Sequence, residues 1–178
     1  MGANKLMVAE VVKYSKHTES RGEIYTIYNR STLLRKTPLP KSILDFKQDK
    51  VSVSYKGVIR GFHGDNDTCK LITCLDGIIQ LVVYDVDKKK KQQFILDSNS
   101  DEVTTVIVPP RHLNAHQCIS KSCIFMYKWS EYYTSPEDQW SVNYNDSDIN
   151  PCWILPETVV SDRDRNAGTL KDLYEKIK

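Results

Sequence analysis

Hydrophobic and polar residues alternate along much of the chain, a pattern typical of β-strands with one buried face. Residues 51–55 read Val-Ser-Val-Ser-Tyr, and further short apolar or alternating runs occupy 22–28, 71–75, 78–86, 94–96, 103–108 and 123–129. Pro109–Pro110 ends one run, because proline cannot donate to a β-ladder. Asp76–Gly77 separates two apolar runs and predicts a two-residue β-hairpin turn.

Helical periodicity is confined to short segments. Residues 41–46 predict one short turn, and residues 170–177 predict a C-terminal helix with Thr169 as its N-cap. One face of that helix carries the apolar residues Leu170, Leu173, Tyr174 and Ile177. The length and the many short strands predict a single all-β domain over residues 1–178, an antiparallel sandwich or barrel with a few short helices.

Charge and composition exclude several classes of partner. The chain has 25 Lys and Arg against 23 Asp and Glu, a balance that does not favour nucleic acid. No apolar run approaches the ~18 residues of a membrane span, and the N-terminal residues lack the apolar stretch of a signal peptide. We therefore expect a cytoplasmic protein with neither a membrane nor a nucleic-acid partner. The five cysteines form no CxxC pair and predict free, mostly packed thiols.

The four histidines decide which chemistry the chain can offer. There is no His-x-His pair of the kind that metal-binding cupins use, and the strand context argues against a helix aligning His112 with His116. We therefore expect no metal site. His63 ends a strand-like run and is a candidate general base, because the ordinary pKa of histidine lies near neutrality. Taken alone, this residue is more typical of ordinary packing than of a catalytic base.

The neighbours of His63 carry a family resemblance. Residues 57–63 read Gly-Val-Ile-Arg-Gly-Phe-His, and Lys70 opens the next strand. Further matching segments follow in order: Ser20-Arg21-Gly22, Asn114-Ala115-His116, Tyr127 to Tyr133, Trp140 with residues 145–153, and Ser161-Asp162-Arg163-Asp164-Arg165. Together, over positions 20–170, these segments resemble the dTDP-4-dehydrorhamnose 3,5-epimerase family.

The resemblance implies a fold and a reaction. The implied fold is a cupin-like antiparallel β-barrel, or jelly roll, usually paired into a homodimer through N-terminal strands. The implied substrate is a 4-keto-6-deoxy sugar linked to a nucleoside diphosphate, and the family needs neither a metal nor an organic cofactor. The implied reaction is epimerisation at C3, C5 or both, by removal of a proton next to the ketone and its return on the opposite face.

The resemblance also implies roles for ten residues. His63 falls on the base, Asp164 on its orienting carboxylate, Tyr127 on the opposing acid and Lys70 on the cation that stabilises the enolate. Asp162 is a less favoured carboxylate. Six more positions fall on substrate contacts, with Arg21 reaching the ligand of the partner subunit: Arg60, His116, Arg21, Gln48, Tyr133 and Arg163.

Several positions depart from the family pattern. The loop at 64–69 is short and resembles a branch that acts on other sugar nucleotides, including GDP-linked 4-keto-heptoses. Lys50 replaces the usual Asn, Thr26 a usual Glu, and Gln139 stands near another usual Glu. These departures leave the nucleotide and the sugar open. The alternatives are a sugar-nucleotide 3,4-ketoisomerase, a non-catalytic sugar-nucleotide-binding cupin and a metal cupin dioxygenase. The complete catalytic set favours the epimerase.

Overall fold

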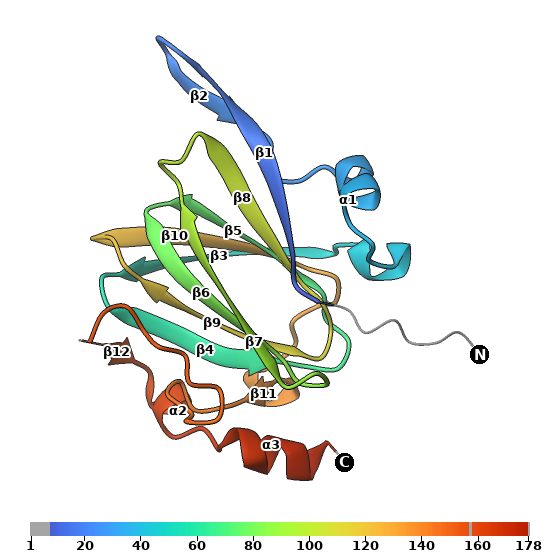
Figure 1. Ribbon diagram of the computed structural model, residues 1–178, viewed down its shortest axis with the longest axis vertical. Coiled ribbons are helices and arrows are strands. Elements are labelled where there is room, and N and C mark those ends of the chain that lie inside the picture. The colour runs from blue at the N-terminus through green and yellow to red at the C-terminus, as the bar shows by residue number, and fades with distance from the viewer. Residues whose placement is uncertain (1–7, 157, 178) are drawn as a thin grey trace.

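The computed structural model describes residues 8–156 and 158–177, which form two sheets with short helices around them (Figure 1). One sheet has the strand order β2-β1-β8-β5-β10-β3, and the other has the order β11-β4-β9-β6-β7 with β12 beside β4. All strand pairs are antiparallel except β12 with β4. The predicted cupin-like antiparallel β-barrel with a few short helices is confirmed.

The strands are β1 (Glu10–Glu19), β2 (Gly22–Tyr25), β3 (Gln48–Tyr55), β4 (Val58–Gly64), β5 (Lys70–Asp76), β6 (Ile78–Asp85), β7 (Lys90–Asp97), β8 (Glu102–Val108), β9 (His112–Cys118), β10 (Ser122–Trp129), β11 (Trp140–Ser141) and β12 (Val159–Val160). The helices are α1 (Arg30–Lys36), α2 (Asp162–Arg165) and α3 (Leu170–Lys176), with 3-10 turns η1 (Lys41–Leu44) and η2 (Pro136–Asp138). None of the helices in the described ranges is long and apolar enough to cross a membrane.

The core lies between the two sheets, and β6 runs through its centre. Leu81 packs in the interior cluster with Ile72 of β5 and Phe125 of β10. The other side of β6 packs against the C-terminal segment, where Val82 shares a cluster with Leu170 of α3. Because both sides of β6 are covered, nearly all of its residues are buried. A third cluster places α1 and η1 over the outer face of the first sheet.

The Asp76–Gly77 turn does not form the predicted hairpin. Strand β5 pairs with β8 and β10, whereas β6 pairs with β7 and β9, so this turn carries the chain from one sheet to the other. Gly77 has a φ of +83°, and a Cβ there would lie 2.2 Å from the carbonyl oxygen of Ser122. The turn chemistry was identified correctly, but tertiary packing rather than the turn decides which strands pair.

Strand β3 is present where the sequence predicts it, but its faces are reversed. Val51, Val53 and Tyr55 are exposed by 60%, 56% and 71%, whereas Ser54 is buried. The expectation of a buried apolar face is therefore wrong for this strand. Its polar residues face the barrel interior, and its apolar residues lie on the outer surface at the edge of the first sheet.

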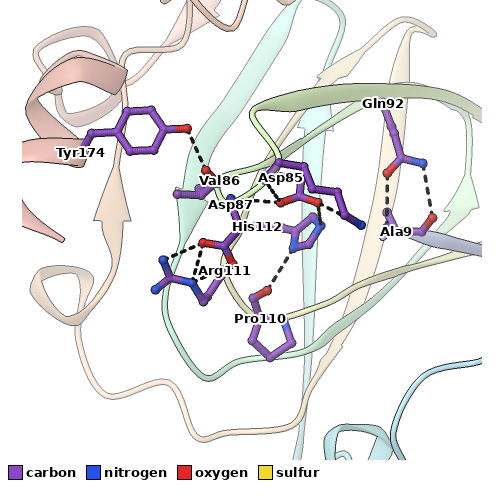
Figure 2. A network of polar contacts seen from close by, with 10 residues as sticks. Ala9, Asp85, Val86, Asp87, Gln92, Pro110, Arg111, His112 and Tyr174 are labelled. Atoms are coloured by element: carbon purple, nitrogen blue, oxygen red, sulfur yellow. Dashed lines mark hydrogen bonds and ion pairs between the residues drawn. The ribbon is translucent and has the colours of Figure 1, made fainter. Parts of the chain in front are cut away.

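Helix α3 confirms the predicted C-terminal helix and its N-cap. Thr169 accepts a hydrogen bond from the backbone N–H of Asp172, and the Asp172 carboxylate accepts one from the backbone N–H of Thr169. This reciprocal capping box satisfies two donors that the helix leaves unpaired. The Tyr174 hydroxyl then donates to the carbonyl oxygen of Val86 at 2.8 Å and fastens α3 to the end of β6 (Figure 2).

Polar contacts also fix the turn between β6 and β7 (Figure 2). Asp85 Oδ1 accepts from the backbone N–H of Asp87, and the Arg111 guanidinium pairs with the Asp87 carboxylate at 2.8 Å. His112 lies 3.0 Å from the carbonyl oxygen of Pro110 and 3.5 Å from Asp85. His112 therefore belongs to this turn and not to the cavity that contains His116.

Candidate active site

A cavity of about 300 Å³ opens between the two sheets and brings together residues that are far apart in the sequence. Strands β3, β5 and β10 of the first sheet and β4 and β9 of the second contribute to its wall, as does α2. Eight of the ten residues predicted to form the site line it: Arg60, His63, Lys70, His116, Tyr127, Tyr133, Arg163 and Asp164. Imidazole, ammonium, guanidinium, phenol and carboxylate groups therefore face the same cavity.

His63 and Asp164 form a close pair, although 101 positions separate them in the chain. His63 Nε2 lies 2.7 Å from Asp164 Oδ1, and the backbone N–H of Gly61 donates to Asp164 Oδ2 at 3.1 Å. Asp164 is buried on α2, whose first turn is capped by the Ser161 side chain. Asp162 is exposed on the same short helix. The helix therefore presents Asp164, and not Asp162, to the histidine.

This geometry determines the protonation states of the pair. A carboxylate can only accept, so it assigns the proton of neutral His63 to Nε2 and leaves the lone pair on Nδ1. Burial lowers the pKa of His63, although Asp164 opposes the shift. Burial acts to raise the pKa of Asp164, but hydrogen bonds from His63 and Gly61 hold it below its ordinary value. Near neutral pH the pair is therefore a neutral imidazole oriented by an ionised carboxylate.

Lys70 places an ammonium group beside this pair. Its Nζ donates to Asn114 Oδ1 at 2.9 Å and to the carbonyl oxygen of His63 at 3.3 Å. It also lies 5.0 Å from the centre of the Trp129 ring. Burial lowers the pKa of Lys70 to about 8, so the group is still mostly protonated at neutral pH. A fixed cation next to a base suits the stabilisation of a developing oxyanion.

Tyr127 belongs to a row of aromatic rings along β10. Its ring centre lies 5.0 Å from that of Phe125 and 5.7 Å from that of Trp129. Among the described residues its hydroxyl has no hydrogen-bond partner, and it lines the cavity. Burial raises the pKa of Tyr127, so the phenol keeps its proton over the working range. The group can therefore act as a proton donor.

His116 and Arg60 stand opposite each other on β9 and β4. The His116 ring stacks on Phe125 at 4.1 Å between centres, and burial lowers the pKa of His116 to about 3. This histidine is therefore neutral. Arg60 donates to Ser54 Oγ at 3.0 Å and to the carbonyl oxygen of Val53 at 3.3 Å. These bonds leave part of its guanidinium available to a bound anion.

Of the four remaining predicted residues, two line the cavity and two do not. Arg163 lines it and donates to Ser141 Oγ at 2.8 Å, and Tyr133 lines it at another position. Gln48 does not line the cavity but accepts a hydrogen bond from the backbone N–H of Tyr133 at 2.8 Å. Arg21 lies in the β1–β2 turn, where its side chain is 83% exposed and pairs with Glu19. Within one chain Arg21 is not part of the site.

Some residues of the cavity were not identified from the sequence. Asn114 anchors Lys70, Ser161 caps the helix that carries Asp164, and Ser52 and Trp129 line the wall. The two-residue period of strands could have indicated Ser52 and Trp129, because alternate residues face the same side. The Ser161-x-x-Asp164 spacing is a local capping signal, but the four-residue helix that it caps, which packs against β4, is too short to show a helical period.

The charge of the cavity favours an anionic ligand. Four basic side chains line it, Lys50, Arg60, Lys70 and Arg163, against the single carboxylate of Asp164. No group of three or more His, Cys, Asp or Glu side chains among the described residues is placed to hold a metal ion. The lining can bind an anion, remove a proton with a histidine and return one from a tyrosine.

Comparison with known proteins identifies relatives over most of the chain. The sequence model described as dTDP-4-dehydrorhamnose 3,5-epimerase matches residues 5–172. A dTDP-4-dehydrorhamnose 3,5-epimerase of Salmonella typhimurium is 29% identical over 153 residues, 81% of each chain. The crystal structure of the enzyme with the same name from Elizabethkingia anophelis has 28% identity and a TM-score of 0.81, and covers 96% of each chain. A 4-keto-6-deoxy sugar epimerase from Streptomyces spheroides shares the fold, with a TM-score of 0.86 at 21% identity over 98% of this chain and 88% of its own.

Proposed function

Because the chain belongs to the dTDP-4-dehydrorhamnose 3,5-epimerase family, an isomerase family, we propose that it epimerises a 4-keto-6-deoxy sugar linked to a nucleoside diphosphate. The observation that carries this proposal is the cavity that holds the His63–Asp164 pair, Lys70 and Tyr127 together. This set supplies a base, an oxyanion-stabilising cation and an acid. The surplus of basic side chains suits the diphosphate.

The first half-reaction uses His63 and Lys70. Nδ1 of His63 removes the proton from a carbon next to the C4 ketone, and the electron pair of that C–H bond moves onto the ketone oxygen as an enolate. The ammonium of Lys70 stabilises this oxygen, and the ionised Asp164 stabilises the imidazolium that forms. The low pKa of free His63 keeps the base unprotonated before the substrate arrives.

The second half-reaction uses Tyr127. Its hydroxyl donates a proton to the opposite face of the same carbon, the enolate returns to the ketone, and the configuration is inverted. The phenolate then regains a proton from solvent, and His63 releases its proton. Each turnover therefore exchanges a carbon-bound hydrogen with water, which makes the reaction visible to deuterium.

Deuterium incorporation tests the proposal directly. The protein is incubated in D2O with dTDP-, GDP-, UDP- and CDP-linked 4-keto-6-deoxy sugars, and C3 and C5 are followed by NMR. Incorporation with inversion at one or both carbons supports an epimerase and identifies the nucleotide. Migration of the ketone to C3 would instead indicate a ketoisomerase. Binding without any exchange would contradict an enzymatic role.

We also propose a homodimer, because both edge strands of the first sheet expose apolar side chains. The exposed Val51, Val53 and Tyr55 form an apolar patch on β3, an edge strand of the first sheet, and Ile24 is 71% exposed on β2 at the opposite edge. Exposed edges and apolar patches favour pairing with another chain. The β1–β2 hairpin projects beyond the barrel in Figure 1, which suits an exchange between two copies that brings Arg21 to the partner's cavity.

Light scattering after size exclusion measures this assembly. The unmodified protein is expected at twice the chain mass of 20.5 kDa. Val53→Glu is expected to shift it toward the monomer, because it places a charge on the patch. Ile95→Glu is the control, because Ile95 is 54% exposed on β7, outside the patch. A monomeric unmodified protein would contradict the dimer.

We also assign the chain to the cytoplasm, as one epimerase domain over residues 1–178. The cysteines support the location, because all five are free thiols and four of them are buried. Unpaired thiols suit a reducing compartment. The extent of the family match, residues 5–172, supports a single functional unit.

A further inference from the structure

Lys50 is a basic residue of the cavity to which the reaction described above gives no role. It lies on the inner face of β3 and pairs in register with Tyr127 on β10. Its Nζ stands 3.5 Å from the centre of the Tyr133 ring and 5.2 Å from that of Trp129. Burial lowers the pKa of Lys50. A half-buried ammonium that rests only on aromatic faces is costly to retain without a ligand.

The other basic groups of the cavity are held by protein oxygens. Lys70 donates to Asn114, Arg60 donates to Ser54, and Arg163 donates to Ser141. Among the described residues, Lys50 Nζ has neither a hydrogen-bond acceptor nor an ion-pair partner. Ser52, the next inward residue on β3, has a buried hydroxyl that is likewise without a partner. Two neighbouring polar groups on one strand therefore remain available to a ligand.

The position of Lys50 indicates which part of the substrate it meets. Arg60, the guanidinium suited to a diphosphate, is anchored at Ser54, and a strand rises ~3.3 Å per residue, so the backbone of Lys50 lies roughly 13 Å along β3 from that of Ser54. Lys50 instead neighbours Tyr127 and shares the Trp129 ring with Lys70. These are the groups assigned to the reacting sugar.

We propose that Lys50 is a specificity-determining residue whose ammonium leaves the Tyr133 ring and donates to an oxygen of the sugar ring, beside the carbon that Tyr127 protonates. This assignment rests on the proposed function and deepens it, because it gives the cavity a second ammonium directed at the sugar rather than at the diphosphate. Where Lys50 stands, the family pattern has an uncharged asparagine, so the chain offers the sugar a charged donor at this point.

Lys50 also acts on Lys70 through its charge. Burial is the main cause of the lowered pKa of Lys70, Asp65 opposes it, and the nearby charge of Lys50 lowers it further. Removing Lys50 should therefore raise the pKa of Lys70 above about 8. This shift follows from the charge of Lys50 alone, so the distinction from a merely structural role comes from comparing the affinities for the bare nucleotide and for the keto-sugar nucleotide.

Calorimetry and kinetics with Lys50→Met test the assignment. The probes are dTDP and GDP alone and the dTDP- and GDP-linked 4-keto-6-deoxy sugars. The variant should bind the keto-sugar nucleotide roughly ten- to a hundredfold more weakly, the effect of one hydrogen bond to a charged group, and bind the bare nucleotide unchanged. The alkaline limb of kcat/KM should move to higher pH. Lys50→Arg should recover part of the affinity, and Lys56→Met, at an exposed lysine, should match the unmodified protein.

The outcomes separate this assignment from the proposed function. Equal losses for the nucleotide and the keto-sugar nucleotide would place Lys50 on the diphosphate and overturn the assignment. Unchanged affinity for both would overturn it as well. If the unmodified protein binds and exchanges a keto-sugar nucleotide, either result leaves the epimerase intact. If the unmodified protein binds none of the keto-sugar nucleotides, the proposed function fails, and the role of Lys50 fails with it.

Discussion

Replacing Asp164 with asparagine keeps the proposed base, His63, but disturbs the contact that orients its imidazole ring. The carboxylate accepts two hydrogen bonds, from His63 Nε2 at 2.7 Å and from the backbone N–H of Gly61 at 3.1 Å. An asparagine of the same shape has one oxygen and one NH2 group, so it cannot accept both. The substitution therefore forces a choice between the two contacts while the volume of the side chain hardly changes.

Either choice reduces activity, by amounts that can be estimated. If the oxygen faces His63, the NH2 group opposes the Gly61 N–H, and losing a charged hydrogen bond costs about 1.5–3 kcal/mol, roughly ten- to a hundredfold in rate. If the NH2 group faces His63, Nε2 must accept, Nδ1 carries the proton, and no base remains. In a serine-protease triad the corresponding loss of the correct tautomer costs about 10⁴ in kcat. We expect Asp164→Asn to lower kcat by a factor between about 10 and about 10⁴, depending on which orientation the amide adopts.

The assay is deuterium exchange at C3 and C5, with thermal unfolding measured in parallel. Asp162→Asn is a matched control, because Asp162 is exposed on the same short helix and should leave kcat unchanged. His63→Ala should abolish exchange and so marks the lower limit. A kcat for Asp164→Asn within twofold of the unmodified protein, with an intact fold, would refute the role given to this carboxylate.

Further changes give distinct expected outcomes. Tyr127→Phe should retain proton removal but not inversion, so NMR should detect deuterium exchange with unchanged configuration; full inversion would assign the acid elsewhere. The kcat/KM profile should rise with pH through the pKa of His63, which burial places below 6.5, and fall near pH 8 as Lys70 loses its proton. Lys70→Arg should remove the fall near pH 8, and its persistence would mean that another group titrates there. Gly77→Ala should lower the unfolding temperature, because a Cβ would meet the Ser122 carbonyl oxygen at 2.2 Å, and an unchanged temperature would contradict the close approach. Activity should survive EDTA; a loss that zinc or iron reverses would establish a metal requirement.

The barrel could be predicted from the sequence, because strands, turns and helix caps are indicated by residues that lie close together in the chain. The N-cap at Thr169 and the end of β8 before Pro109–Pro110 depend on residues that are neighbours in the chain, and both appear where they were predicted. The partners of each strand were not accessible in this way. The turn at Asp76–Gly77 demands a positive φ whether the chain folds back or crosses to the other sheet, so only the packed core distinguishes a hairpin from a crossover.

The residues of the site could be predicted only as a set, from several motifs that occur in the order typical of one family. His63 and Asp164 lie 101 positions apart, and nothing near either residue indicates that they meet. The family motifs supply that link, and the structure places eight of the ten proposed residues around one cavity. Arg21 is not among them, because its side chain is exposed in the β1–β2 turn and would reach a cavity only in the proposed dimer. The capping of α2 by Ser161 was missed, because so short a helix has no periodicity to reveal it.

The reversed faces of strand β3 have a physical cause that relates to the cavity. In an isolated strand, Val51, Val53 and Tyr55 would be expected to face the core, and the intervening polar residues would face water. In this barrel the inner side of β3 borders the candidate active-site cavity. Polar side chains that can bind a substrate therefore suit this side better than apolar ones. Among the described residues, the inward Lys50 ammonium and Ser52 hydroxyl have no hydrogen-bond partner, and the outward apolar side chains remain exposed. One edge strand thus contributes polar residues to the candidate site on its inner face and apolar residues to the proposed dimer contact on its outer face.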